Sequence, residues 1–144
     1  MTVWAYKDGV LASDSRISTH SAGITGEMKK VIKSGAGWLG AAAGNATDMA
    51  QFLRWVDEGR EEDDATKLEN VDGILISPKG KVFYVEGDLH PFAVEAPFHA
   101  GGAGGYLAIG AMEMGATAEE AVHIAIKYNS SCGGEVQVVK LKGS

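Results

Sequence analysis

Two short apolar runs at the start of the chain are separated by a pair of turn-forming residues. Residues 2–7 (TVWAYK) and 10–13 (VLAS) flank Asp8-Gly9. This pair suits a type I′ turn, because both central residues of that turn need positive φ. The pattern therefore predicts a β-hairpin. The same combination of β-compatible runs and turn residues predicts two more hairpins and a last strand, over residues 29–44, 73–87 and 135–141.

The turn fixes which residues of the first hairpin lie side by side. A two-residue turn pairs Lys7 with Val10, and counting back along the two strands places Thr2 next to Asp14. If Met1 is removed, Thr2 carries a hydroxyl nucleophile and an amine base on one residue, a combination that no internal residue has. The start of the chain is therefore a candidate catalytic site.

Apolar residues recur at helical spacing in three segments, which are predicted to be helices: residues 47–58, 105–114 and 117–128. Thr117 and Glu120 form a capping-box pattern that fixes the start of the last helix. Two polar stretches are predicted to lack regular structure. Residues 15–27 are expected to be a loop, and the acidic run 57–64 a solvated connection.

Strands joined as hairpins, with helices grouped apart from them, indicate an α+β protein. The order along the chain is strands, helix, strands, two helices, strand. This order favours antiparallel sheets that pack on each other under a cover of helices, rather than a parallel doubly wound sheet. The 144 residues are expected to form a single domain, because they suffice for one core and no linker interrupts them.

The composition argues against several classes of function. The chain is 45% hydrophobic and 22% charged, near the globular average, so disorder is not expected. Its net charge is −6 and its basic residues are scattered, so no surface for nucleic acid is expected. No apolar run is long enough to cross a membrane. The single cysteine, Cys132, forms no internal disulfide, and no secretion signal is recognisable, so a cytoplasmic location is expected.

Five motifs follow one another along the chain: ASDSR (12–16), KKVIK (29–33), AAGNATDM (42–49), AGGAGGY (100–106) and NSSCGG (129–134). With the Thr that follows Met1, they resemble a proteasome β subunit over almost the whole chain. The resemblance extends to the peptidase subunit of the bacterial ATP-dependent protease, of the same N-terminal-nucleophile family. It implies a four-layer αββα sandwich of two antiparallel sheets. It also implies a threonine peptidase that acts on peptides or unfolded proteins, in a homo-oligomeric ring that an ATPase unfoldase can serve.

The resemblance assigns roles to four positions of this chain. Thr2 matches the nucleophile, whose own α-amine takes the proton once Met1 is gone; such an amine has a pKa of about 7.7–8.0 and suits a base at neutral pH. Lys30 matches the active-site lysine, and Asp14 the carboxylate that holds it. Gly44 matches the glycine whose backbone N–H forms the oxyanion hole.

Further positions match the surroundings of that site. The resemblance implies that the first specificity pocket is lined by four apolar residues, Ile17, Met28, Ala42 and Ala46. Four more positions are expected to support the site: Arg16, Ala103, Asn129 and Cys132. Three of these depart from the family, which has serine in place of Ala103 and, in many active subunits, aspartate and serine in place of Asn129 and Cys132. These departures remove groups that orient the N-terminal amine.

Other interpretations of the same residues stay open at this stage. Lys29, Lys30 and Lys33 could be ordinary solvated side chains of an edge strand, and Cys132 is better explained as a small buried residue than as a reactive thiol. A family member without turnover, serving as an assembly or scaffold protein, is the alternative to a peptidase. A third alternative is an N-terminal-nucleophile amidase that acts on small amides. No metal or cofactor is expected, because the histidines lack paired ligand spacing.

Overall fold

The computed structural model describes residues 1–18, 25–60 and 68–143, which contain helices and antiparallel strands joined by turns and loops. The strands form three antiparallel sheets, of four, two and five strands. The three helices of the described residues are α1 (Ala46–Asp57), α2 (Gly105–Glu113) and α3 (Ala118–Tyr128). The predicted α+β class with antiparallel sheets is therefore confirmed.

The four-stranded sheet has the order β10-β1-β2-β11, with bounds Phe98–Gly102, Val3–Lys7, Val10–Ser13 and Gln137–Lys140. Both faces of its strand β1 are covered. Val3 and Ala5 pack against α2 and α3, whereas Trp4 and Tyr6 point to the other side and pack against the five-stranded sheet. The alternation follows from the two-residue period of a strand, and it explains why nearly all of VWAYK is apolar.

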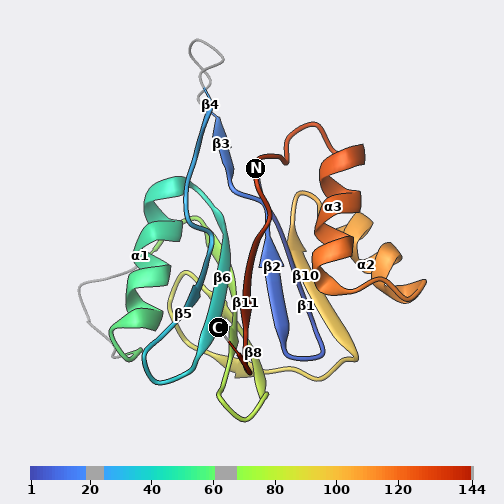
Figure 1. The fold of residues 1–144 in the computed structure, drawn as a ribbon. Coiled ribbons are helices and arrows are strands. Elements are labelled where there is room, and N and C mark those ends of the chain that lie inside the picture. Colours follow the sequence, from blue (N-terminus) through green and yellow to red (C-terminus); the bar gives the residue numbers. More distant parts are fainter. Residues whose placement is uncertain (19–24, 61–67, 144) are drawn as a thin grey trace.

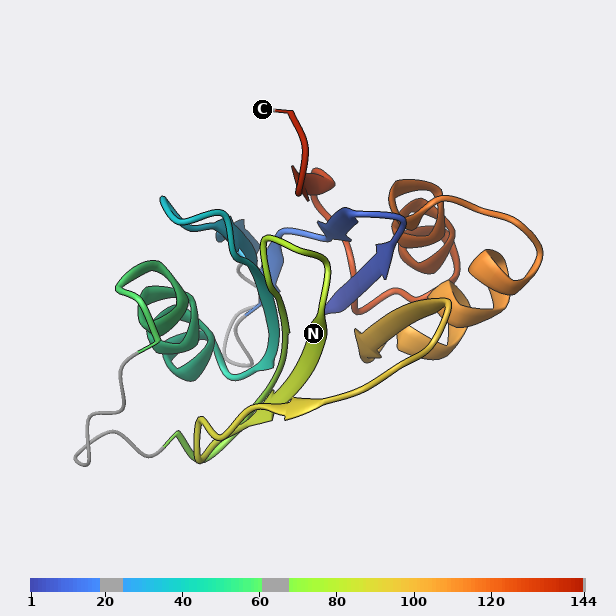
Figure 2. The same ribbon diagram turned by 90° about the horizontal axis from the view of Figure 1, so that it is seen from below.

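The five-stranded sheet has the order β5-β6-β7-β8-β9, with bounds Val31–Lys33, Leu39–Gly44, Val71–Ile76, Val82–Glu86 and Phe92–Ala93. Helix α1 packs on one face of this sheet through Met49, Phe52 and Val56. Figure 1 shows α1 on the left and α2 with α3 on the right, with the sheets between them, and Figure 2 shows the same arrangement from below. A cluster that joins Leu11 to Ile74 lies between the two larger sheets.

Several strand pairings of the described residues were not predicted, among them those of β10 with β1 and of β3 (Arg16–Ser18) with β4 (Thr25–Glu27). Strand β10 pairs with β1 although its sequence, FHAGG, is rich in glycine. Its glycines are required by close packing, because a Cβ on Gly101 would lie 2.3 Å from the Trp4 ring. The stretch 15–27, predicted to be a loop, contains the two-stranded sheet of β3 and β4. That part of the prediction was wrong, because two polar strands leave no apolar alternation to detect.

Most other elements lie where the apolar pattern placed them, within two or three residues. The exception in length is the last strand, β11, which is four residues long against the seven predicted. Residues 19–24 of the predicted loop and 61–64 of the acidic run lie outside the described residues. Among the described helices, none combines the length and the apolar character needed to cross a membrane.

Candidate active site

The first hairpin brings the start of the chain beside Asp14. Asp8 and Gly9 have φ of 52° and 78°, the positive pair that a type I′ turn needs, and Lys7 pairs with Val10 as predicted. The pairing continues to the end of the strands. The Val3 amide donates to Asp14 Oδ1 at 3.1 Å, and the Asp14 amide donates to the Val3 carbonyl at 3.1 Å. The predicted register is therefore confirmed.

Lys30 is buried in the same place. Its ammonium Nζ donates to three oxygens, at 3.1 Å to Asp14 Oδ1, 2.7 Å to the Arg16 carbonyl and 3.0 Å to the Met1 carbonyl. Its side chain is 1% exposed and that of Asp14 is inaccessible. The interpretation of Lys30 as a solvated side chain is thereby excluded, whereas Lys29 is exposed.

Asp14 is also held from the opposite side, by the loop that precedes β11. The Gly133 amide donates to Asp14 Oδ2 at 3.1 Å, and the Gly133 carbonyl accepts from the amides of Ser15 and Arg16 at 3.1 and 3.0 Å. The carboxylate therefore accepts two backbone N–H groups and the Lys30 ammonium. Hydrogen bonds to the charged form offset the desolvation that a buried carboxylate suffers.

Thr2 is clamped between this ion pair and the glycine segment after β10. The residue is 3% exposed, and its carbonyl accepts from the Gly104 amide at 3.2 Å. Gly102 has φ of +81°, and a Cβ there would lie 2.2 Å from the Thr2 carbonyl oxygen. The Thr2 hydroxyl lies 3.9 Å from the sulfur of Met49, on α1. The AGGAGGY motif thus fixes the backbone of the first residues.

A cavity of about 620 Å³ lies next to Thr2. Of the predicted residues, its lining includes Thr2, Arg16, Ile17, Lys30, Gly44 and Ala46. Met28 and Ala42 are not part of the lining; both belong to the apolar cluster under α1, Ala42 fully buried and Met28 at its edge. The lining residues that sequence reasoning did not identify include Ser18, Met49, Asn70, Ser130 and Ser131.

Gly44 ends β6 at the edge of this cavity in a conformation that favours glycine. Its φ is +142°, and a Cβ would lie 1.9 Å from the Asn70 carbonyl oxygen. The next residue, Asn45, is the N-cap of α1, since its side-chain oxygen accepts from the Asp48 amide at 2.8 Å. The strand therefore turns directly into the helix at the cavity wall.

Three of the positions expected to support the site, Ala103, Asn129 and Cys132, lie together behind the cavity. Asn129 donates through Nδ2 to the Ala103 carbonyl at 3.1 Å and accepts from the Ser131 amide at 3.0 Å. Cys132 is 2% exposed, which confirms the interpretation as a small buried residue. Burial raises the pKa of the Cys132 thiol, and the charge of Asp14 raises it further.

Arg16 connects this group to the cavity. Its guanidinium donates to the Ser130 carbonyl, and it lies against Gly133, where a Cβ would be 2.8 Å from Arg16 Nη1. Its Nε has no partner among the residues described. In residues 1–18, 25–60 and 68–143, no three His, Cys, Asp or Glu side chains are grouped so that they could hold a metal ion.

Comparison with known proteins shows similarity in structure but none in sequence families. No protein-family model matches the sequence, and no curated protein matches it. The chain is similar to two solved structures of the protein BPH from Thiobacillus denitrificans, at 19% and 20% sequence identity, with a TM-score of 0.64 and 99% of either chain covered in both cases. The fold is shared with that protein. In the first of these structures BPH is in complex with epoxomicin.

Proposed function

We propose that this chain is a proteasome-like threonine peptidase, an N-terminal nucleophile hydrolase that uses Thr2 after removal of Met1. One observation carries the proposal. The Lys30 ammonium, buried against Asp14, lies 3.0 Å from the carbonyl oxygen of Met1, the group bonded to the Thr2 nitrogen. A buried ammonium at this point favours the deprotonated forms of the α-amine and hydroxyl that cleavage would leave on Thr2.

In the proposed reaction, Thr2 Oγ forms a bond to the carbonyl carbon of a peptide, and its proton passes to the Thr2 α-amine. The negative charge that develops on the carbonyl oxygen is stabilised by the Gly44 N–H. The tetrahedral intermediate then breaks its C–N bond, and the leaving amine takes the proton. Water adds to the resulting ester, releases the acid and restores the hydroxyl. In this scheme neither Lys30 nor Asp14 donates or accepts a proton.

The fold supports the same proposal. Helices α2 and α3 pack on the four-stranded sheet and α1 packs on the five-stranded sheet, and we propose that these layers form the αββα sandwich of the N-terminal nucleophile hydrolases. The likeness to BPH spans 99% of the chain. BPH was solved with epoxomicin, a peptide epoxyketone, and a ligand of that class is what the present site is proposed to bind.

The proposed substrate is a peptide or an unfolded protein. Ile17, Ala46 and Met49 give the cavity beside Thr2 an apolar wall, which suits an apolar side chain. Exposed apolar side chains on α2, at its C-cap and on α3 support a homo-oligomer, since Tyr106 is 95% exposed, Met114 88% and Tyr128 66%. A ring and an ATPase unfoldase partner are proposed on the family resemblance, and a cytoplasmic location on the single cysteine.

A scaffold protein without turnover is the second candidate. It is favoured by Asn129, whose amide is occupied by the Ala103 carbonyl and by Ser131, and by Ala103, which offers no side-chain hydroxyl. The two candidates differ in one measurable respect. A peptidase forms a covalent adduct at Thr2, and a scaffold does not.

The deciding experiment is intact-mass spectrometry after incubation with epoxomicin. The expected result is a protein that lacks Met1 and gains the mass of one inhibitor, because the Thr2 hydroxyl adds to the ketone and the amine opens the epoxide. Thr2→Ala should give no adduct and no hydrolysis of a fluorogenic peptide, while the exposed control Thr47→Ala should behave as the wild type. Hydrolysis that persists in Thr2→Ala refutes the mechanism. A wild type that lacks Met1 but forms no adduct supports the scaffold.

A further inference from the structure

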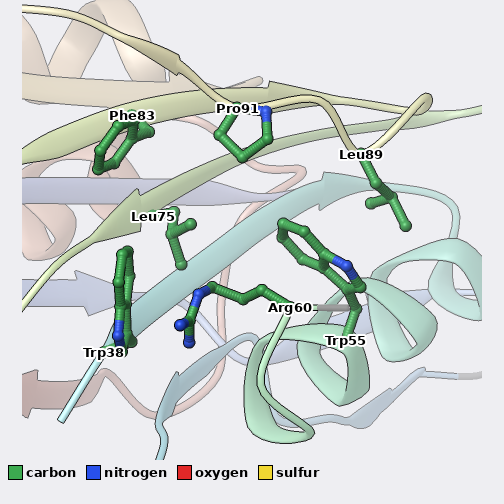
Figure 3. A pocket seen from close by; sticks show the side chains of 7 residues that line it. All are labelled: Trp38, Trp55, Arg60, Leu75, Phe83, Leu89 and Pro91. Atoms are coloured by element: carbon green, nitrogen blue, oxygen red, sulfur yellow. The ribbon is translucent and has the colours of Figure 1, made fainter. Parts of the chain in front are cut away.

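A second pocket lies at the C-terminal end of α1, over the face of the five-stranded sheet that this helix covers (Figure 3). Its volume is about 260 Å³. One wall is Trp38, which immediately precedes β6, whereas Gly44 is the last residue of that strand. At about 3.3 Å per residue, the two sites are roughly 20 Å apart. The pocket is therefore separate from the candidate active site.

The walls of this pocket are apolar and mostly flat. Trp38 and Phe83 are neighbours with ring centroids 6.2 Å apart, and Trp55 faces them from α1. Leu75 lies between these aromatic rings in Figure 3, and Leu89 closes one end. Such walls suit the ring of a planar apolar ligand.

The polar groups in the pocket are hydrogen-bond donors. Arg60 Nη1 and Trp55 Nε1 are buried, and neither has a hydrogen-bond partner among the described residues. The side chains that line the pocket include no hydroxyl, amide or carboxylate that could accept from them. Buried donors in proteins are nearly always paired, so the unpaired Arg60 Nη1 points to an acceptor supplied by a ligand.

The charge of Arg60 indicates that this acceptor is an anion. Its guanidinium stacks on Trp38, with Cζ 3.7 Å from the ring centroid, and no carboxylate of the described residues lies within 4.0 Å of it. Burial lowers the pKa of the Arg60 guanidinium, because desolvation disfavours its charged form. A planar carboxylate fits the fork of a guanidinium better than any neutral acceptor does.

The end of α1 places Arg60 in this position. Gly59 and Arg60 have φ of +100° and +63°, and the Arg60 amide donates to the Trp55 carbonyl at 2.8 Å. The chain therefore turns back on the helix, and Figure 3 shows the Arg60 side chain running from the helix end toward Trp38. The donor is positioned by the backbone and not by a flexible surface loop.

We propose that this pocket binds a small aromatic carboxylate, with its ring against Trp55 and Phe83 and its carboxylate on the Arg60 guanidinium beside Trp38. A cavity of about 150 Å³ holds a benzene ring, so about 260 Å³ has room for a one- or two-ring acid. The site does not depend on Thr2, and binding is expected whether or not the chain is a peptidase.

The test is calorimetric titration of the full chain with indole-3-acetate, together with NMR of the three tryptophan indole N–H signals. The dissociation constant is expected on the order of 0.1–1 mM. Indole-3-acetamide, which lacks the charge, should bind about tenfold more weakly. The signals of Trp38 and Trp55, assigned with Trp→Phe variants, should shift, and that of Trp4 should not.

Two variants of α1 and its end separate a specific site from general attraction to positive charge. Arg60→Gln should weaken indole-3-acetate binding at least tenfold, while Arg54→Gln, which removes an exposed arginine of the same helix, should leave it unchanged. Circular dichroism confirms that both variants are folded. Equal binding by the two variants, equal binding of acid and amide, or no binding at 10 mM overturns the proposal. Binding of a peptide Ala-Ala-Ala-Ala-Trp more than tenfold tighter than indole-3-acetate also overturns it, in favour of a protein C-terminus.

Discussion

Lys30 and Asp14 form an ion pair of 3.1 Å in which one side chain is 1% exposed and the other 0%. Two charges so far from water are stable only because both are fully hydrogen-bonded, by backbone groups from three separate segments. The pair therefore holds together the chain start, the beginning of β5 and the loop before β11. It is a structural element as well as a proposed catalytic one.

Breaking this pair should destabilise the fold strongly. Lys30→Met leaves the Asp14 carboxylate buried without a counter-charge, which we expect to lower the free energy of unfolding by about 3–5 kcal/mol. Urea unfolding followed by circular dichroism measures the loss. Lys29→Met, at the exposed neighbour, should change it by less than about 0.5 kcal/mol. Similar free energies of unfolding for the two variants would show that the ion pair contributes little to stability.

A side chain at Gly44 should damage both the fold and the cavity wall. Gly44→Ala places a Cβ 1.9 Å from the Asn70 carbonyl oxygen at a φ of +142°, so we expect a loss of at least about 2 kcal/mol in urea unfolding. Gly110→Ala is the matched control, since it lies within α2 and has open space around its Cβ. That variant should gain about 0.5–1 kcal/mol. A stable Gly44→Ala protein would contradict the close contact.

The buried His99 should make stability depend on pH. Burial lowers the pKa of His99 below its ordinary value of about 6.5, and its Nδ1 lies 2.9 Å from the Tyr84 hydroxyl. Between the two pKa values the unfolded chain binds a proton that the folded chain does not. The free energy of unfolding should therefore fall as pH drops below about 6.5 toward the folded-state pKa.

Urea unfolding at pH 7.5, 6.5 and 5.5 measures this dependence. His99→Gln should flatten the curve over that range, because it removes the group that titrates. His123→Gln, at an exposed position of α3, should keep the wild-type slope. A slope that is the same in all three proteins would mean that other groups account for it.

The capping box at the start of α3 should make a smaller contribution to the stability of the fold. Thr117 accepts from the Glu120 amide at 3.1 Å, and Glu120 accepts from the Thr117 amide at 2.9 Å. Thr117→Ala should cost about 1 kcal/mol, or about 2–4 °C in melting temperature. Glu119→Ala, beside the capping box, should have little effect. If the two variants melt together, the capping box does not stabilise α3.

Local signals in the sequence were sufficient for much of the fold. The turn at Asp8-Gly9, the capping box at Thr117 and the apolar stripe of α1 each depend on residues a few positions apart, and each prediction was confirmed. The register that brings Thr2 to Asp14 follows from the first of these by counting. Lys30 was assigned to the site by a motif, and the structure buries it beside Asp14.

Features that depend on distant segments were not predictable. From the sequence alone, strand β10 looks like a glycine loop. Its glycines are explained only by their contact with Trp4, which lies on the neighbouring strand β1. The Gly133 N–H that binds Asp14 is separated from it by 119 positions. Met28 and Ala42 were expected to line the cavity by analogy, but the packing under α1 places them in the core. The pocket around Arg60 also joins segments that no local pattern connects.

The bend formed by Asp8 and Gly9 constrains how this segment can change in length during evolution. Because side chains of a strand alternate between its faces, one residue inserted into a single arm would move Trp4 and Tyr6 out of the core and take Thr2 away from Asp14. Residues can be added or lost only as matched pairs, one from each arm. We therefore expect the length of this hairpin to differ between natural relatives by even numbers of residues. The start of the first strand should stay beside the aspartate in space, whatever the length of the hairpin.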